Sequence, residues 1–293
     1  MSDGFNGRRM TSSTVAFAFP ERALADEARN IRLDIAEALH GISAGGHYGG
    51  CFSVVEILLA LYRLALEVRP AEPDYPDRSR LILSKGHAAL TLYAILHRLG
   101  FFAADLKSYA SSASALEGHP DMISLPGIDF STGSLGQGLS VAAGMALALQ
   151  PRGIPVWAVL GDGECQEGQV WEAAMFASLY RLSNLRVVVD CNGFQECGWN
   201  FARPGPAIAP VPGMAAKWSS FGWKVIACDG HSFAELAHSF STAAATDAQP
   251  AVILARTVKG KGASLIEEKP IRFHCTAVSR EEHELIVTQL LAS

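Results

Sequence analysis

The chain has 293 residues, of which 49% are hydrophobic, and a formal net charge of −5. This is enough for one large α/β domain with a buried core. No apolar run reaches the ~20 residues that a membrane-spanning helix needs, and no basic block favours nucleic acid, so we expect neither partner. Residues 1–14 are polar and lack the apolar segment of a signal peptide, so we expect residues 1–20 to be a flexible tail.

Six cysteines are scattered along the chain, and none forms a C-x-x-C pair. A zinc site is therefore not expected. At this chain length the spacing is typical of reduced thiols rather than of a disulfide framework. We interpret the cysteines as small buried apolar side chains of a cytoplasmic protein.

The first half of the chain alternates helices with glycine-containing loops. An apolar stripe predicts a helix over 21–40, which Gly41 should end. Ser53 and Glu56 have the spacing of a capping box, which predicts a second helix from there to about residue 66. Further along we expect a short strand at 80–83, a helix from 84 to 99, a short helix at 105–109 and a helix of small residues at 139–149.

The second half alternates strands and helices. The strands are apolar throughout, as is typical of a parallel sheet covered on both faces. We therefore predict one α/β domain over 21–293, with a doubly wound, mostly parallel sheet and helices on both faces. The expected strands are 156–160, 185–189, 223–228 and 251–258, and the expected helices are 169–182, 214–221, 232–245 and 280–291.

Two polar residues follow consecutive strands of this sheet. Asp162, within Gly-Asp-Gly at 161–163, ends one strand, and Asn192 ends the next. Alone, Gly-Asp-Gly is more often a tight turn. Parallel strands joined by one helix, however, end at the same edge of the sheet, where open α/β sheets bind ligands. Carboxylate and amide oxygens suit Mg²⁺ held against a diphosphate, and the backbone carbonyl of Phe194 is placed to supply a third ligand.

A glycine-rich loop at 133–138 precedes the helix of small residues. It lacks the G-x-G-x-x-G fingerprint of a dinucleotide site, and taken alone it is most simply a helix-start turn. As a functional loop it would let the backbone of Gly133, Ser134 and Leu135 approach a flat heterocycle.

Three histidines, His47, His87 and His119, each follow a glycine, which lets the main chain come close to a ligand. Any one of them is more simply a hydrogen-bonded structural histidine. Together with His274 they predict an imidazole-lined pocket for a polyhydroxylated substrate. His231 also follows a glycine, but it lies beside a helix start, and we interpret it as structural.

These motifs occur in the same order in the transketolase family, which the chain resembles from about residue 21 to 274. Six or seven spaced motifs in order are highly specific. The matched part looks like the diphosphate-binding domain, the N-terminal third of a full transketolase. The motifs are S-A-G-G-H at 43–47, S-K-G-H at 84–87, E-G-H-P at 117–120, T-G-S-L-G-Q-G at 132–138, G-D-G at 161–163 followed by E-G at 167–168, D-C-N at 190–192, and K-G-K-G at 259–262 before His274.

The resemblance implies a role for each matched position. Asp162, Asn192 and the Phe194 carbonyl would bind Mg²⁺. His47, His119 and His274 would contact the sugar or keto substrate and handle protons around the reacting carbon. Glu167, counted with these catalytic residues, would bond toward a carboxylate of the partner. The residues that would contact thiamine diphosphate are His87, Gly133, Ser134, Leu135, Gly161, Gly163, Glu167 and His274.

The resemblance also implies a missing half. In the family, a pyrimidine-binding domain supplies the glutamate that protonates the aminopyrimidine of the cofactor, and the chain is too short to contain it. We therefore expect the N-terminal subunit of a split transketolase. With a separate C-terminal subunit, in an α2β2 heterotetramer, it would transfer a two-carbon ketol unit from a ketose donor to an aldehyde acceptor.

Other functions are open at this point. Segment 193–212 departs from the family pattern. A related carbon–carbon bond-forming subunit of specialised metabolism, with this loop reshaped for an unusual acceptor or partner, would explain the departure, and so would neutral variation of the loop. Deoxyxylulose-phosphate synthase is normally one chain, and a 2-oxoacid dehydrogenase component does not explain the histidines. A non-catalytic cofactor-binding partner would not need to keep the metal ligands and histidines. An NAD(P)-binding reductase shares the architecture but not the fingerprint.

Overall fold

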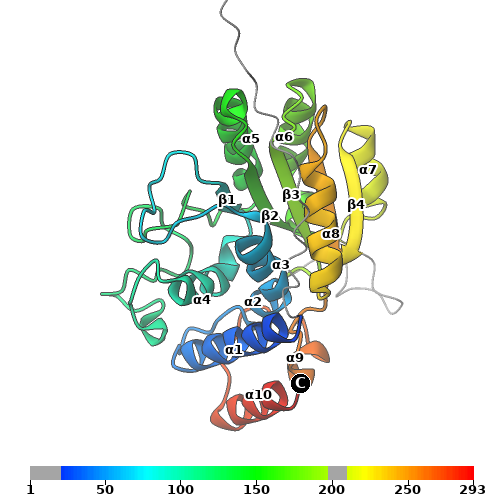
Figure 1. Ribbon diagram of the computed structural model, residues 1–293. Coiled ribbons are helices and arrows are strands. Elements are labelled where there is room, and N and C mark those ends of the chain that lie inside the picture. Colours follow the sequence, from blue (N-terminus) through cyan, green and yellow to red (C-terminus); the bar gives the residue numbers. More distant parts are fainter. Residues whose placement is uncertain (1–20, 197–209) are drawn as a thin grey trace, which may run out of the picture.

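Five strands form the centre of the computed structural model, which describes residues 21–196 and 210–293 (Figure 1). Their order across the sheet is β1-β2-β3-β5-β4, and every pairing is parallel. The predicted α/β fold with a parallel sheet is confirmed. The predicted tail at 1–20 lies outside the described residues. The strands are β1 (Arg80–Leu83), β2 (Val156–Gly161), β3 (Leu185–Cys191), β4 (Lys224–Asp229) and β5 (Ala251–Arg256).

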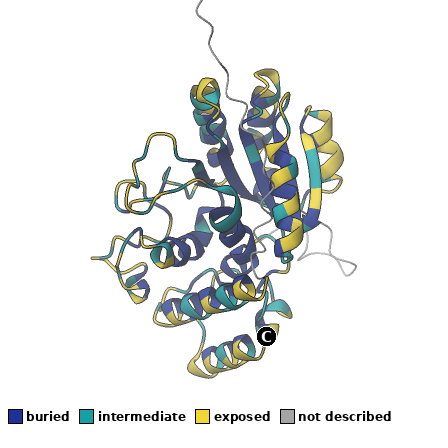
Figure 2. Cartoon of the chain, viewed as in Figure 1, coloured by how far each residue is buried: buried dark blue, intermediate teal, exposed yellow. Residues whose placement is uncertain are grey.

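Helices cover both faces of the sheet, so that two buried cores form. Successive side chains of β2 enter opposite cores: Trp157 and Val159 enter one, and Ala158 and Leu160 the other. This explains why the strands are apolar at every position (Figure 2). Three helices pack into one core: α5 (Gln137–Leu149), α6 (Gly168–Leu179) and α7 (Met214–Ser220). The other core is formed with α1 (Glu21–His40), α2 (Tyr48–Ser53), α3 (Val55–Ala60), α4 (Ala89–Leu99), α8 (Phe233–Ala244), α9 (Ser264–Glu267) and α10 (Arg280–Ala292).

The helix start predicted at Ser53 is wrong. Helix α2 already begins at Tyr48, and α3 follows at Val55 and continues into a wider turn at Leu61–Ala65. The Ser53 hydroxyl does not cap a helix but donates to Asp190 Oδ2 at 2.7 Å. Glu56 likewise binds Arg32 of α1 instead of the helix start. Ser53 and Glu56, which have the capping-box spacing, therefore make long-range contacts and do not cap a helix.

Most other predicted elements are found with ends shifted by a few residues. The helix predicted to end at residue 99 does so, and Gly100 ends it with a φ of +85°, a conformation that glycine reaches without strain. The short α9 was not predicted, because four residues are too few for a periodic pattern. In the described part of the chain, no helix has both the length and the apolar character needed to cross a bilayer.

Gly138 and Gly144 lie on α5 in opposite surroundings. A Cβ at Gly138 would be 2.8 Å from the Cα of Ser84, whereas one at Gly144 would have no neighbour within 4 Å. We expect Gly138→Ala to lower the free energy of unfolding by about 1–3 kcal/mol, because α5 must move away from the backbone after β1. Gly144→Ala should raise it by about 0.5–1 kcal/mol, because alanine favours the helix. Urea unfolding of both variants measures the difference, and equal effects would contradict this packing.

Candidate active site

A cavity of about 350 Å³ opens at the carboxyl ends of β2 and β3. Its walls come from loops that are far apart in the sequence, between residues 47 and 274. Most of the predicted site residues meet here, as the sheet-edge argument requires. Those that line the cavity are His47, His87, Gly133, Leu135, Gly161, Asp162, Gly163, Glu167, Asn192, Phe194 and His274.

Two predicted site residues, Ser134 and His119, are not among those that line the cavity. The His119 ring lies behind the glycine loop, since a Cβ at Gly133 would be 3.3 Å from its Cδ2. It is also close enough to His47 to lower the pKa of that imidazole. His119 therefore forms part of the wall behind the cavity, and its direct contact with a substrate stays a prediction.

Asp162 joins the loops after β2 and β3. Its Oδ1 accepts from the Gly163 N–H at 2.9 Å and its Oδ2 from the Gly193 N–H at 2.7 Å. Asn192 Oδ1 accepts from the Phe194 N–H at 3.0 Å, which shapes the second loop. Burial, and then the neighbouring Asp190 carboxylate, raise the pKa of Asp162 to about 7. A bound cation would oppose both effects and favour the carboxylate.

The imidazoles of His47, His87 and His274 form one cluster that lines the cavity. Their ring centroids are 5.3 Å (His47–His87), 5.6 Å (His47–His274) and 5.7 Å (His87–His274) apart. Burial is the main cause that lowers the pKa of His47 to about 4 and that of His274 to about 3. These two rings are therefore neutral near pH 7, when each can both donate and accept a hydrogen bond.

Lys259 is a site residue to which the sequence analysis gave no role. Its side chain is buried, and its Nζ lies 2.8 Å from His274 Nδ1. Burial, and then Lys85, lower the pKa of Lys259 to about 8. An ammonium group can only donate, so Nδ1 of His274 accepts and the ring proton sits on Nε2. The K-G-K-G motif contains this lysine, but its partner could not be found without the fold.

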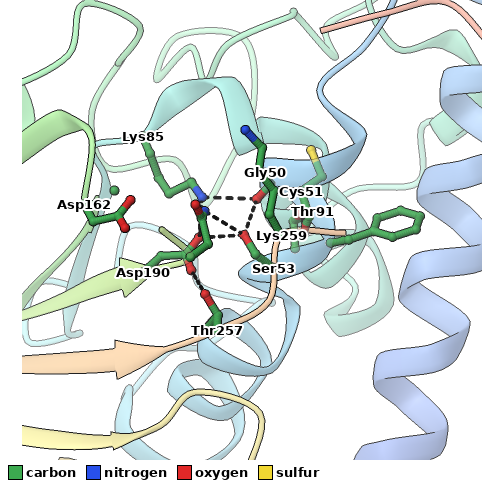
Figure 3. Close-up of polar contacts among 12 residues, drawn as sticks. Gly50, Cys51, Ser53, Lys85, Thr91, Asp162, Asp190, Thr257 and Lys259 are labelled. Carbon is green, nitrogen blue, oxygen red and sulfur yellow. Dashed lines mark hydrogen bonds and ion pairs between the residues drawn. The ribbon is translucent and has the colours of Figure 1, made fainter. Parts of the chain in front are cut away.

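A buried ion pair lies beneath the cavity (Figure 3). Lys85 Nζ is 2.5 Å from Asp190 Oδ2, and the side chains are 1% and 0% exposed. The ammonium also donates to the Gly50 carbonyl at 3.1 Å, while Asp190 accepts from the hydroxyls of Ser53 and Thr257. Burial alone would raise the pKa of Asp190, but Lys85 and these hydrogen bonds lower it. The pair joins α2, the turn after β1, the end of β3 and the loop after β5.

Glu164 also lines the cavity and holds separate segments together, and the sequence analysis did not identify it. It is buried, and its carboxylate accepts from the N–H groups of Gly136 at 2.9 Å and Gly161 at 3.0 Å, and from the Ser84 hydroxyl. It therefore fixes the glycine loop before α5 against the end of β2. Glu167, three residues further on, is exposed at the rim.

The sequence matches the family described as transketolase, thiamine diphosphate binding domain, over residues 21–290. It is 41% identical over 248 residues to the 6-deoxy-6-sulfo-D-fructose transketolase subunit SqwG of Clostridium sp. (strain MSTE9), covering 84% of this chain and 88% of that protein. The chain belongs to the transketolase family.

This transketolase chain is also 36% identical to an apulose-4-phosphate transketolase subunit of Actinobacillus succinogenes, covering 91% of this chain and 95% of that one. It is 36% identical to human transketolase, over 92% of this chain but only 42% of the relative. The solved transketolase of Campylobacter jejuni superposes with a TM-score of 0.79 at 27% identity, covering 92% of this chain and 43% of that one. The predicted family and its N-terminal subunit type are confirmed, and the chain spans less than half of these two longer transketolases.

The buried pair can be tested in this transketolase chain by a double-mutant cycle. We expect Lys85→Met and Asp190→Asn each to lower the free energy of unfolding by about 3–5 kcal/mol, because each leaves its buried partner without a counter-charge. The double variant should lose clearly less than the sum. Urea unfolding measures all three. The exposed pair Arg280 and Glu284 is the control, since Arg280→Met should cost no more than about 0.5 kcal/mol. Additive losses at Lys85 and Asp190 would refute the coupling.

Proposed function

We propose that the chain is the thiamine diphosphate- and Mg²⁺-binding subunit of a two-component transketolase. Together with a C-terminal, pyrimidine-binding subunit it transfers a two-carbon ketol unit from a ketose donor to an aldehyde acceptor. The observation that carries the proposal is one cavity lined both by oxygen donors and by a cluster of three imidazoles. The two relatives of similar length, which are themselves named as transketolase subunits, support it.

The donor set fits Mg²⁺ on a diphosphate. It combines the carboxylate of Asp162, the amide of Asn192 and the backbone carbonyl of Phe194, which are oxygen ligands of the kind that Mg²⁺ prefers. In the described residues there is no group of three or more His, Cys, Asp or Glu side chains that could hold a metal. The cavity volume, about 350 Å³, lies in the range of cofactor sites. Lys259 adds a positive charge at the wall.

When bound, the cofactor supplies the nucleophilic carbon that carries the ketol unit. The metal ligands of the chain would orient the diphosphate, and Gly133, Ser134 and Leu135 would lie against its ring. The neutral imidazoles would bind substrate hydroxyls and move protons around the reacting carbon. His274 would act there as a donor, because Lys259 occupies its Nδ1.

A partner subunit is supported by the outer side of α5 and α6. Leu147 on α5, Met175 and Leu179 on α6, and Tyr180 just after α6 are exposed, Leu179 by 78%. A helix that is apolar on all sides is normally covered. Both helices begin beside the cavity, near Glu167, and these side chains lie toward their other ends, so a subunit that covers both helices along their length would reach the site. We propose an α2β2 heterotetramer in the cytoplasm, where the five described free cysteines would stay reduced.

A second candidate is a related thiamine diphosphate-dependent subunit of specialised metabolism. Glu196, which departs from the family pattern, lines the cavity beside Gln195, which matches it. The two relatives of similar length are named for different sugars, 6-deoxy-6-sulfo-D-fructose and apulose-4-phosphate. Their names favour an unusual sugar rather than a different type of reaction. Within the segment 193–212 that departs from the family pattern, residues 197–209 lie outside the described residues.

Calorimetric titration of thiamine diphosphate with Mg²⁺ into the chain tests the cofactor site. We expect Asp162→Ala to weaken binding by about 100-fold, because the metal loses its charged ligand. Asp247→Ala, in an exposed turn, is the control and should bind like the wild type. Replacing Mg²⁺ with EDTA should weaken cofactor binding by the wild type as much as Asp162→Ala does. Equal binding by Asp162→Ala and the wild type would exclude this metal site. If the lone wild type does not bind, the titration is repeated with the partner subunit, and failure there excludes the function.

The proposed docking surface is tested by Leu179→Glu on α6. A charge at the centre of a buried apolar interface should weaken association with the C-terminal subunit by about tenfold or more. Leu291→Glu on α10 places the same charge at another exposed leucine, 63% exposed, and should leave association unchanged. Sedimentation of the mixed subunits measures both. If only Leu291→Glu disrupts the complex, the partner docks elsewhere.

A further inference from the structure

A second buried ion pair lies outside the cavity. The Arg32 guanidinium of α1 binds both carboxylate oxygens of Glu56 on α3, at 2.7 and 2.6 Å, and the side chains are 6% and 8% exposed. Burial alone would raise the pKa of Glu56, but Arg32 and the hydrogen bond to His231 outweigh burial and lower it to about 2. Glu56 is therefore a carboxylate at neutral pH.

His231 connects this carboxylate to the loop after β5. Its Nδ1 lies 3.0 Å from Glu56 Oε2, and its Nε2 lies 2.8 Å from the backbone nitrogen of Val258. A backbone N–H can only donate, so Nε2 accepts and the ring proton is on Nδ1, where it is donated to Glu56. The ring is thus held at both ends in one neutral tautomer, as in carboxylate–histidine pairs that orient a ligand.

The loop that His231 holds carries Lys259 into the cavity. Thr257 is anchored to Asp190, and the Gly260 N–H donates to the Gly49 carbonyl at 3.2 Å. Val258 lies between them, and its side chain is 41% exposed, so packing contributes little to its position. The Val258 N–H is fixed by His231, and the Val258 carbonyl, in the peptide immediately before Lys259, accepts from the Lys261 N–H at 3.1 Å. The bond to His231 is therefore a contact by which a side chain from outside this loop holds Val258. The Lys259 ammonium then reaches His274 Nδ1 at 2.8 Å.

We propose that Arg32, Glu56 and His231 are positioning residues for Lys259. They fix the Val258 amide. This amide sets the direction in which Lys259 enters the cavity, and Lys259 in turn sets the tautomer of His274. None of the three is among the described residues that line the cavity. The effect on cofactor binding rests on the proposed function, whereas the effect on His274 does not. His231, interpreted from the sequence as structural, thereby acts on the site through two neighbours.

The test uses the full chain with ¹⁵N-labelled histidine. Long-range ¹H–¹⁵N spectra report which ring nitrogen of His274 carries the proton, and Lys259→Met shows the state without the lysine. We expect the wild type to show the Nε2–H form. His231→Phe, which fills the space of the ring without either hydrogen bond, should shift His274 toward the Lys259→Met spectrum. His231→Gln, which keeps one donor and one acceptor, should restore the wild-type form.

A matched control is His238→Phe on the exposed side of α8, which should leave the His274 spectrum unchanged. Thermal unfolding shows that each variant is folded. If His231→Phe does not fold, His231→Asn replaces it, because its side chain is too short to reach both partners. If the folded His231→Phe variant, or His231→Asn in its place, keeps the wild-type His274 tautomer, the proposal is overturned.

Cofactor titration adds a second readout. We expect His231→Phe to weaken binding of thiamine diphosphate with Mg²⁺ by about tenfold or more, as is usual when a group that orients a ligand is removed. His231→Gln should lie near the wild type. If the wild type binds no cofactor even with its partner subunit, the proposed function fails, while the His274 spectra still decide the positioning role.

Discussion

The ion pair of Lys85 and Asp190 is the contact on which the rest of the site depends. Two charges without access to water are costly, and the structure compensates them only by drawing donors and acceptors from four separate segments. The segments that meet at the pair form part of the cavity wall. The glycine loop and the end of β2 form another part, which Glu164 holds. The shape of the cavity therefore depends on the compensation of these buried charges.

Burial and two lysines set the protonation of the site. Burial is the larger cause, and with Lys85 and Lys259 it lowers the pKa of His47 and His274. These two histidines are therefore poor cations but good hydrogen-bonding groups near pH 7. At Asp162, burial and Asp190 act against the charge of the carboxylate. The site thus combines neutral imidazoles with a carboxylate that a cation would stabilise, which is what the proposed metal-bound diphosphate and sugar would need.

Sequence reasoning found what depends on local pattern. Apolar runs located the five strands, and strand ends located Asp162 and Asn192, because parallel strands necessarily bring their carboxyl ends to one edge. It failed where a side chain binds a residue that is distant in the sequence. Ser53 has a capping spacing but binds Asp190, 137 residues away. Lys85 and Asp190 are 105 residues apart, and neither motif alone indicates that the other residue compensates its charge. Such pairs become visible only when the fold brings the segments together.

The apolar outer side of α5 and α6 has a consequence for how the protein must be made. Until the proposed partner covers them, Leu179 and its neighbours expose to water a surface to which any other apolar surface can bind, including a second copy of the chain. In the proposed assembly, the chain is open to aggregation during the interval between its folding and the docking of the partner. Balanced synthesis of the two subunits would shorten that interval.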